Sequence, residues 1–145
     1  MHPVIILDDA HEMRVDVMGM LKAVTNFDWD SRLGVSLLLV GQKKLAKLLA
    51  RDDLEDITRR LSHIATLEPL SREQAHQYLQ HRLTVAGARR FPFETRAVEM
   101  LYDAARGNLR ATDQLALKCL EVAHFENSDL VDANHVMKAR KLVCP

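Results

Sequence analysis

The amino-acid sequence predicts an α/β region followed by an all-α region, with helix predominating over strand. Apolar runs typical of strands lie at residues 3–7 and 35–40, with a weaker one at residues 63–67. Beyond Pro69 we find no further strand pattern, and apolar residues recur three and four apart, as in amphipathic helices. We therefore expect two domains, residues 1–70 and residues 71–145.

Composition excludes several classes of protein. The chain has 145 residues, of which 48% are hydrophobic, as expected of a globular fold. Its twenty basic and twenty acidic residues cancel, so it has no overall attraction to nucleic acid or anionic lipid. No apolar run approaches the roughly 20 residues of a membrane helix, and no secretory signal opens the chain, so we expect a cytoplasmic protein. Cys119 and Cys144 lack metal-binding spacing, and Cys119 is expected to be a buried thiol.

The first region is expected to form a parallel strand–helix–strand unit. Its helix spans residues 12–24, with an inward stripe of Met13, Val17, Met20, Leu21 and Val24. Because the second strand is continuously apolar, it is expected to be a central strand covered on both faces. Two short helices follow, at residues 43–50 and 54–61.

The second region is expected to form a bundle of four amphipathic helices. The first opens on a capping box of Ser71 and Gln74 and stops at Gly87. The second runs from about residue 94 to residue 106, and the third begins directly after Gly107 and Asn108. The last begins near Asp132, which acts as its N-cap.

Two adjacent acids, Asp8 and Asp9, follow the first strand. In an open parallel sheet, side chains at this end of a strand face the ligand crevice. A carboxylate there is costly to bury without a cation, so Mg²⁺ with a nucleotide phosphate is a natural partner. One acid would hold the metal while the next polarises the attacking water, as in the Walker B motif. The alternative is that both acids merely cap the following helix.

Several separated segments resemble the AAA+ ATPases of the ExeA and TniB/TnsC kind, which are helpers in secretion-system assembly or DNA transposition. These segments are "VIILDDAHE", "NFDWDSR", "LLLVGQKKLAKLLA", "RRLSHIATLEPLSREQAHQYLQHRLTVAG" and "ARGNLRATDQLALKCL". The resemblance covers nearly the whole chain. It implies the C-terminal half of a parallel-sheet nucleotide-binding core, followed by a four-helix lid.

The resemblance assigns a role to each acid and to one amide. Asp8 takes the magnesium position, and Asp9 takes the place of the catalytic Glu. Because Asp is one methylene shorter than Glu, slow hydrolysis is expected. Gln42, in "LVGQ", falls at the sensor position that reads the γ-phosphate, where its amide can donate to phosphate or water.

The resemblance also assigns two arginines. Arg60 falls where the family places a finger that reaches into a neighbouring subunit's site, and Arg59 is a near-equal candidate. Arg110, in "GNLR", falls at the second sensor, through which the lid detects nucleotide. A positive charge at a helix N-terminus is unfavourable to the dipole, so an anion close to Arg110 would explain it.

The phosphate-binding loop of such ATPases, G-x-x-x-x-G-K-[ST], does not occur here, because none of the five glycines begins it. We therefore expect the C-terminal portion of a longer ATPase whose cofactors are ATP and Mg²⁺. The chain alone should be inactive and bind nucleotide weakly or not at all. The expected partners are further copies in a ring or filament, a transposase or secretion component, and DNA. An unpaired sheet edge would also favour self-association.

Other classes of protein remain open. The helical region could be a protein-interaction module without nucleotide chemistry. It could also bind DNA through a helix-turn-helix, although Arg110 and Lys118 are too few basic residues for a convincing footprint. A metal site could form from Asp8, Asp9, His11 and Glu12. The regulatory STAND ATPases also use "LDDAH", but the segment "PLSREQAHQYLQHRL" argues against them.

Overall fold

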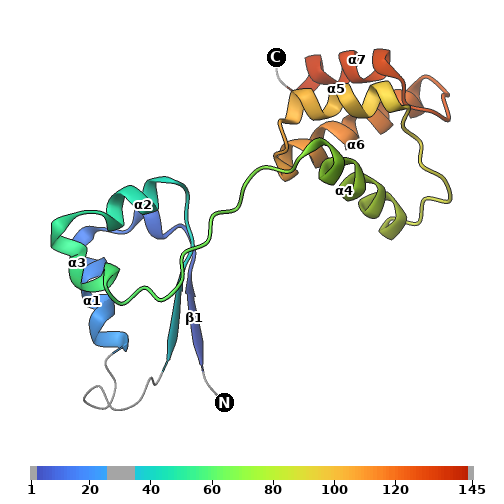
Figure 1. The fold of residues 1–145 in the computed structure, drawn as a ribbon. Coiled ribbons are helices and arrows are strands. Elements are labelled where there is room, and N and C mark those ends of the chain that lie inside the picture. The colour runs from blue at the N-terminus through green and yellow to red at the C-terminus, as the bar shows by residue number, and fades with distance from the viewer. Residues whose placement is uncertain (1–2, 26–34, 144–145) are drawn as a thin grey trace. The chain divides into compact units, whose positions relative to one another are not determined.

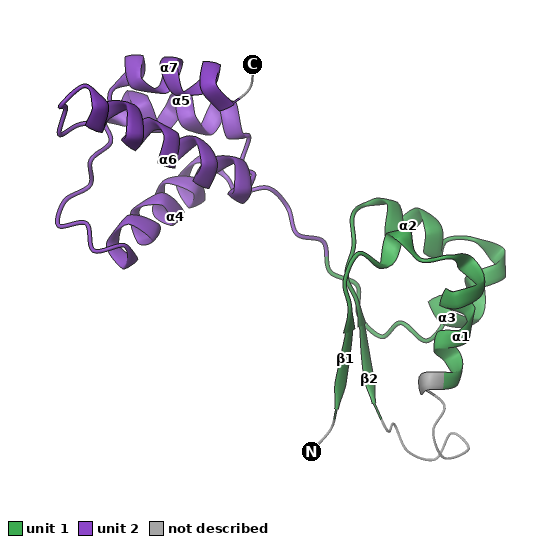
Figure 2. Cartoon of the chain, turned by 180° about the vertical axis from the view of Figure 1, so that it is seen from behind, with its two compact units in different colours: residues 1–65 green, residues 66–145 purple. Residues whose placement is uncertain are grey.

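The computed structural model describes residues 3–25 and 35–143. The chain divides into two compact units, residues 1–65 and residues 66–145, which are coloured separately in Figure 2. The first unit contains both strands and three helices, and the second contains four helices. An α/β region followed by an all-α region is thus confirmed.

The first unit is built on two parallel strands. Strand β1 spans Val4–Leu7 and strand β2 spans Ser36–Leu39, paired in register from Val4 opposite Ser36 to Leu7 opposite Leu39. A 3-10 turn at Ala10–Glu12 and helix α1, Val15–Thr25, lie between them in the sequence. The predicted strand–helix–strand order is therefore confirmed, with the helix beginning three residues later than expected.

Two short helices complete this unit. Helix α2 spans Lys44–Leu49, and a 3-10 turn at Asp52–Leu54 leads into helix α3, Glu55–Thr58. The hydroxyl of Thr58 donates to the carbonyl oxygen of Leu49 at 2.6 Å, which ties the end of α3 to the end of α2. The core consists of five buried side chains: Ala10, Met18, Leu45, Leu54 and Ile57.

The buried face of α1 differs from the expected one. Met18 is fully buried with Val15 and Leu21 beside it, whereas Met20 is 69% exposed and Val17 is also exposed. Both sets of residues recur at helical spacing, so periodicity alone did not identify which face packs inward. Met13 and Leu21 pack against the core as predicted. The side chain of Val24 lies outside the described residues.

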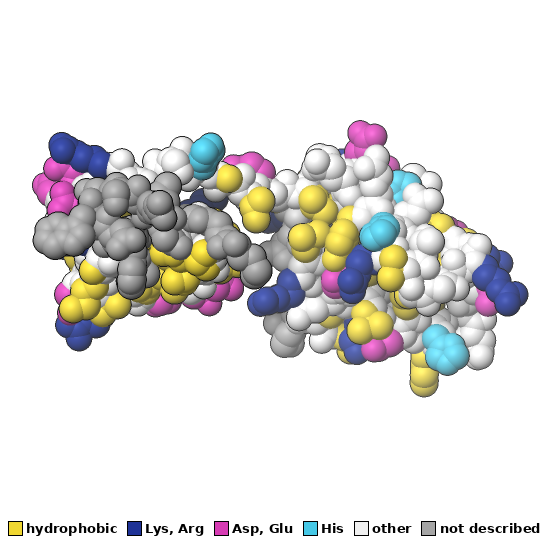
Figure 3. Space-filling model, turned by 90° about the horizontal axis from the view of Figure 1, so that it is seen from below, with side chains coloured by type: hydrophobic (Ala, Val, Ile, Leu, Met, Phe, Trp, Pro, Cys, Tyr) yellow, Lys and Arg dark blue, Asp and Glu magenta, His cyan; other side chains and the backbone are white. Residues whose placement is uncertain are grey.

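Only one face of the described sheet is covered. Helices α1–α3 lie on one side of the strands (Figures 1 and 2). Val4, Ile6 and Leu38 share the opposite face and are exposed. Figure 3 shows that hydrophobic side chains are open to solvent on this unit. The expectation of cover on both faces is not met within the described residues. The apolar side chains on this face are instead exposed to solvent.

The predicted third strand at residues 63–67 is wrong. The chain from Leu61 to Leu70 has no regular secondary structure, and Leu67 is 94% exposed. A strand requires a hydrogen-bonded neighbour, and among the described residues β1 pairs only with β2. Apolar residues in this segment therefore do not by themselves make a strand.

The second unit is a bundle of four helices. Helix α4 spans Arg72–Val85, α5 spans Thr95–Ala105, α6 spans Leu109–Phe125 and α7 spans Ala133–Val143. Its core is a cluster of buried side chains from all four helices and the loops between them: Leu79, Phe93, Ala97, Leu101, Leu115, Ala116, Cys119, Ala123, Val131, Val136 and Ala139. Burial raises the pKa of the Cys119 thiol to about 12, so it is an inert core residue.

The predicted helix starts are present. The Ser71 hydroxyl accepts from the Gln74 backbone N–H at 3.2 Å, and the Gln74 side chain accepts from the Ser71 N–H at 2.9 Å. Asn108 accepts from the N–H of Ala111 at 3.0 Å and so caps α6. Asp132 accepts from the N–H groups of Asn134 and His135 at the start of α7.

A close backbone contact holds Leu70, in the segment before α4, against the turn that opens α6. The N–H of Leu70 donates to the carbonyl oxygen of Gly107 at 3.0 Å, and the Tyr102 hydroxyl donates to the carbonyl oxygen of Leu70 at 3.2 Å. Leu70 is therefore fixed against the turn that opens α6. Across the described residues, we found no helix with the length and apolar character required to span a membrane.

Candidate functional site

The carboxyl ends of β1 and β2 meet at one edge of the sheet because the strands are parallel and in register. Beyond the strands, the Val40 N–H donates to the Leu7 carbonyl at 2.9 Å, and the Ala10 N–H donates to the Val40 carbonyl at 2.8 Å. These bonds carry the pairing past the strand ends. The residues that follow β1, Asp8 and Asp9, are thereby placed beside the residues that follow β2.

The two acids form a tight turn at this edge. The N–H of Asp9 donates to Oδ1 of Asp8 at 2.8 Å. Asp9 has φ 50° and ψ 32°, a left-handed conformation that is uncommon for a residue other than glycine. Its carboxylate is 76% exposed, and Asp8 is exposed too. The burial that was expected to make a cation necessary is therefore absent from the described structure, and both acids are instead open to a ligand from solvent.

Gln42 lies at the same edge, three residues after the end of β2. Its carbonyl oxygen accepts from the N–H of Leu45 at 2.8 Å in the turn that opens α2. Its backbone N–H donates to Nδ1 of His11 at 3.3 Å. Gln42 itself is exposed, so its side-chain amide is available at the edge that carries the acids.

The burial of His11 at this edge was not predicted from the sequence. Its side chain is only 2% exposed, and Nε2 lies 3.1 Å from Oε1 of Glu12. A lone histidine in "DDAHE" has no spacing that predicts burial. The signal lies in Gly41, whose missing side chain leaves room for the imidazole, and only the parallel pairing brings the two residues together.

The three predicted arginines lie away from the strand ends in the sequence. Arg59 forms an ion pair with Glu55 at 2.7 Å across one turn of α3. Arg60 follows directly and is exposed. Arg110 is the second residue of α6 in the other unit and is exposed, with no ion pair to it among residues 3–25 and 35–143. The described structure thus brings together Asp8, Asp9 and Gln42.

The donor set at this edge suits Mg²⁺ better than a metal held by protein alone. No group of three His, Cys, Asp or Glu side chains in the described parts of the chain is arranged to hold a metal. Mg²⁺ usually keeps several waters and binds through one or two carboxylates together with substrate phosphates. Two exposed neighbouring carboxylates match that requirement, whereas the phosphate-binding loop is not among the 145 residues.

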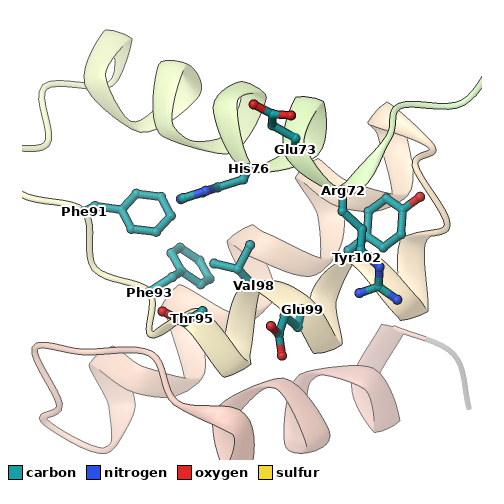
Figure 4. A pocket seen from close by; sticks show the side chains of 9 residues that line it. All are labelled: Arg72, Glu73, His76, Phe91, Phe93, Thr95, Val98, Glu99 and Tyr102. Atoms are coloured by element: carbon teal, nitrogen blue, oxygen red, sulfur yellow. The ribbon is translucent and has the colours of Figure 1, made fainter.

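The second unit contains a separate cavity of about 390 Å³ between α4 and α5. Figure 4 shows Phe91, Phe93 and Val98 within it and Glu73 and Glu99 on opposite sides. The Arg72 guanidinium donates to Asp103 at 2.6 Å and lies 4.8 Å from the centre of the Tyr102 ring. Since Arg72 is paired, the two glutamates leave the cavity rim acidic.

Comparison with known proteins supports the resemblance found in the sequence. No protein-family model matches the chain. A curated relative, General secretion pathway protein A of Aeromonas hydrophila, is 26% identical over 125 residues, which is 86% of this chain and 23% of that protein. The chain thus spans about a quarter of its curated relative.

Solved structures with a similar fold include RuvB of Thermotoga maritima. One RuvB structure matches 98% of this chain and 45% of its own with a TM-score of 0.75 and 16% identity. Another, of the RuvB Holliday junction branch migration motor, matches 96% of this chain and 44% of its own with a TM-score of 0.71 and 19% identity. The chain therefore resembles the ExeA-like AAA+ ATPases in sequence, and it has the fold of the C-terminal region of an AAA+ core with its helical lid.

Proposed function

We propose that this chain is part of an ATP-hydrolysing AAA+ protein, in which residues 1–70 complete the nucleotide-binding core and residues 71–145 form the lid. Asp8 holds Mg²⁺ at the carboxyl end of β1. Asp9 polarises the attacking water, and Gln42 contacts the γ-phosphate. Mg²⁺ held by Asp8 would supply positive charge beside the phosphates.

The observation that carries this proposal is the meeting of Asp8, Asp9 and Gln42 at one edge of a parallel sheet. Parallel α/β sheets bind ligands outside the carboxyl ends of their strands. The first two residues are carboxylates, which suit Mg²⁺, and the third is an amide, which donates to phosphate or water. The likeness to an AAA+ core adds weight, because it covers nearly the whole chain.

The proposal is tested first by the coding sequence upstream of Met1. It should contain a G-x-x-x-x-G-K-[ST] loop some tens of residues before Asp8. In the protein that includes this loop, Asp9→Asn should abolish ATP turnover while nucleotide binding persists. The matched control is Asp16→Asn, which removes a charge from the start of α1, where Asp16 pairs with Arg14. Turnover by Asp9→Asn at the unmodified rate would remove Asp9 from the mechanism.

We also propose that Arg60 acts as an arginine finger toward a neighbouring copy and that Arg110 senses nucleotide through the lid. A finger of this kind contributes on the order of 10³–10⁵ in rate. Mixing an Arg60→Ala subunit with an Asp8→Asn subunit should restore activity, since each supplies what the other lacks. Arg59→Ala, tested in the same mixture, distinguishes which of the two adjacent arginines is the finger. Absence of recovery in the mixture would contradict a shared active site.

The name of the curated relative, General secretion pathway protein A, favours secretion as the process that this ATPase serves. We propose a cytoplasmic helper in secretion-system assembly, acting as a ring or filament with a secretion component as its partner. A helper in DNA transposition, with a transposase and DNA as partners, is the alternative. A neighbouring secretion operon or transposase gene would separate the two.

The acidic cavity between α4 and α5 favours a second function, an interaction module. Its apolar floor and the carboxylates of Glu73 and Glu99 fit a partner peptide that presents an aromatic side chain beside lysine or arginine. A labelled peptide with one Phe flanked by Lys should bind more tightly than the same peptide flanked by Glu. Glu99→Lys should reverse this preference. Equal binding of both peptides would contradict the module.

A further inference from the structure

We propose that His11 is a positioning residue that holds Gln42 at a fixed place relative to the turn of Asp8 and Asp9. This inference rests on the proposed function of that edge. His11 lies two residues after Asp9, and its ring accepts a hydrogen bond from the backbone of Gln42, 31 residues along the chain. One side chain thus connects the two strand ends.

The hydrogen bond from Gln42 indicates which ring nitrogen is the acceptor. Nδ1 accepts from the N–H of Gln42 at 3.3 Å, so it has no proton of its own in this arrangement. Nε2 lies 3.1 Å from Oε1 of Glu12, which can accept its proton. Nδ1 is 3.9 Å from Oδ1 of Asp9, too far for a hydrogen bond. The ring therefore accepts from the segment that follows β2 through Nδ1, while Nε2 lies beside Glu12 in the segment that follows β1.

Gly41 makes this arrangement possible. A Cβ atom at Gly41 would lie 3.1 Å from Nδ1 of His11, 3.2 Å from its backbone nitrogen and 3.3 Å from Cδ2 of Leu45. The backbone after β2 thus passes directly over the imidazole. With only 2% of its side chain exposed, His11 has little room to change its orientation.

This connection has a consequence for the reaction rather than only for folding. The carboxylate that polarises water and the amide that reads the γ-phosphate must keep a constant separation, and a displacement of about 1 Å can cost 100-fold in rate. The bond from Gln42 to Nδ1 fixes the backbone that carries the amide. Its loss should lower the rate of hydrolysis more than the affinity for ATP.

Two substitutions separate the roles of the ring's two nitrogens. In His11→Asn, Oδ1 can occupy the place of Nδ1 and accept from Gln42. In His11→Gln, the longer amide reaches toward the place of Nε2 and Glu12, so the acceptor for Gln42 is lost. In the full-length protein with its phosphate-binding loop, we expect His11→Gln to lower kcat on the order of tenfold with KM for ATP little changed. His11→Asn should recover most of that loss.

The variants His11→Gln and His11→Asn should also differ in a measurement that needs no nucleotide. Amide hydrogen exchange at Gln42, followed by NMR in this chain, should accelerate in His11→Gln and stay close to the unmodified rate in His11→Asn. Exchange at Leu101, in the other unit, is the internal control. Equal kcat and equal Gln42 exchange in the two variants would overturn the inference.

The two proposals fail in different ways. If Asp9→Asn abolishes turnover but the two His11 variants behave alike, ATP hydrolysis stands and the role of His11 is wrong. If the full-length protein does not hydrolyse ATP, the proposed function is wrong. In that case a difference in Gln42 exchange would still support the connection from His11 to the second strand end.

Discussion

Replacement of Gly107 by alanine should lower the free energy of unfolding of the helical unit, because it disturbs the contact between Leu70 and the turn that opens α6. Gly107 has φ +74°, and a Cβ there would lie 2.3 Å from the carbonyl oxygen of Leu70 and 2.8 Å from its nitrogen. Both atoms belong to the backbone and cannot rotate away as a side chain would. The Leu70 to Gly107 hydrogen bond must therefore stretch or break.

Gly87 provides a matched control for the size of this effect. It has φ +88°, but a Cβ there would meet nothing within 4 Å. A left-handed alanine costs about 1–2 kcal/mol, and the loss of unfolded-chain entropy returns about 0.4–1 kcal/mol, which leaves about 1 kcal/mol for Gly87→Ala. Forcing the backbone apart at Gly107 adds about 1–3 kcal/mol. Gly107→Ala should therefore cost about 2–4 kcal/mol.

Urea unfolding followed by far-ultraviolet circular dichroism measures both losses as changes in the free energy of unfolding. The reasoning requires Gly107→Ala to be the more destabilising variant by at least about 1 kcal/mol. Equal losses in the two variants would refute the argument from the close contact with Leu70. A smaller loss in Gly107→Ala than in Gly87→Ala would refute it as well.

Three further predictions follow from the same structure. Burial raises the pKa of the Cys119 thiol to about 12, so this thiol should resist alkylation at pH 8 until urea unfolds the bundle. Because the pKa is higher in the folded than in the unfolded chain, the thiol's contribution to the free energy of unfolding should decrease as the pH rises from about 9 toward about 12, which alkaline unfolding experiments measure. Asp132→Ala should lower the free energy of unfolding by about 1 kcal/mol and Asp132→Asn by only about a few tenths, since asparagine can also cap α7. The backbone hydrogen bond from His135 depresses the pKa of Asp132, so its contribution is present above the ordinary value of 3.8 and is lost as an acid titration passes through the folded-state pKa, a dependence that Asp132→Asn should lack. Ile6→Lys should reduce concentration-dependent self-association in analytical ultracentrifugation by placing a charge on the exposed sheet face, while the exposed Val85→Lys on α4 should not.

Local signals predicted much of the fold because they act within a few residues. Ser71 and Gln74 form both bonds of the capping box, and Asp132 caps the helix that it was expected to open. The parallel pairing of β1 and β2 also followed from an apolar run, a helical period and a second apolar run. These features depend on neighbouring residues or on one crossover, so the sequence alone carries them.

Other features depend on contacts that no local pattern contains. Helix α1 has two apolar faces, and only packing selects Met18 over Met20 for the core. The segment around Leu67 has apolar residues but no strand beside it within the described residues. His11 could not be placed because its burial depends on Gly41, thirty positions away, which approaches it only after the strands pair. Long-range contacts therefore account for what the sequence left open.

The main proposal is that Asp8 and Asp9 act on a magnesium-bound triphosphate with separate roles. The most direct test is the rate of ATP hydrolysis against Mg²⁺ concentration in the protein that includes the phosphate-binding loop. Asp8→Asn should raise the Mg²⁺ concentration for half-maximal rate, whereas Asp9→Asn should lower the maximal rate with the metal requirement unchanged. Asp16→Asn, on α1, should do neither. An unchanged magnesium requirement in Asp8→Asn, together with full turnover in Asp9→Asn, would contradict the account.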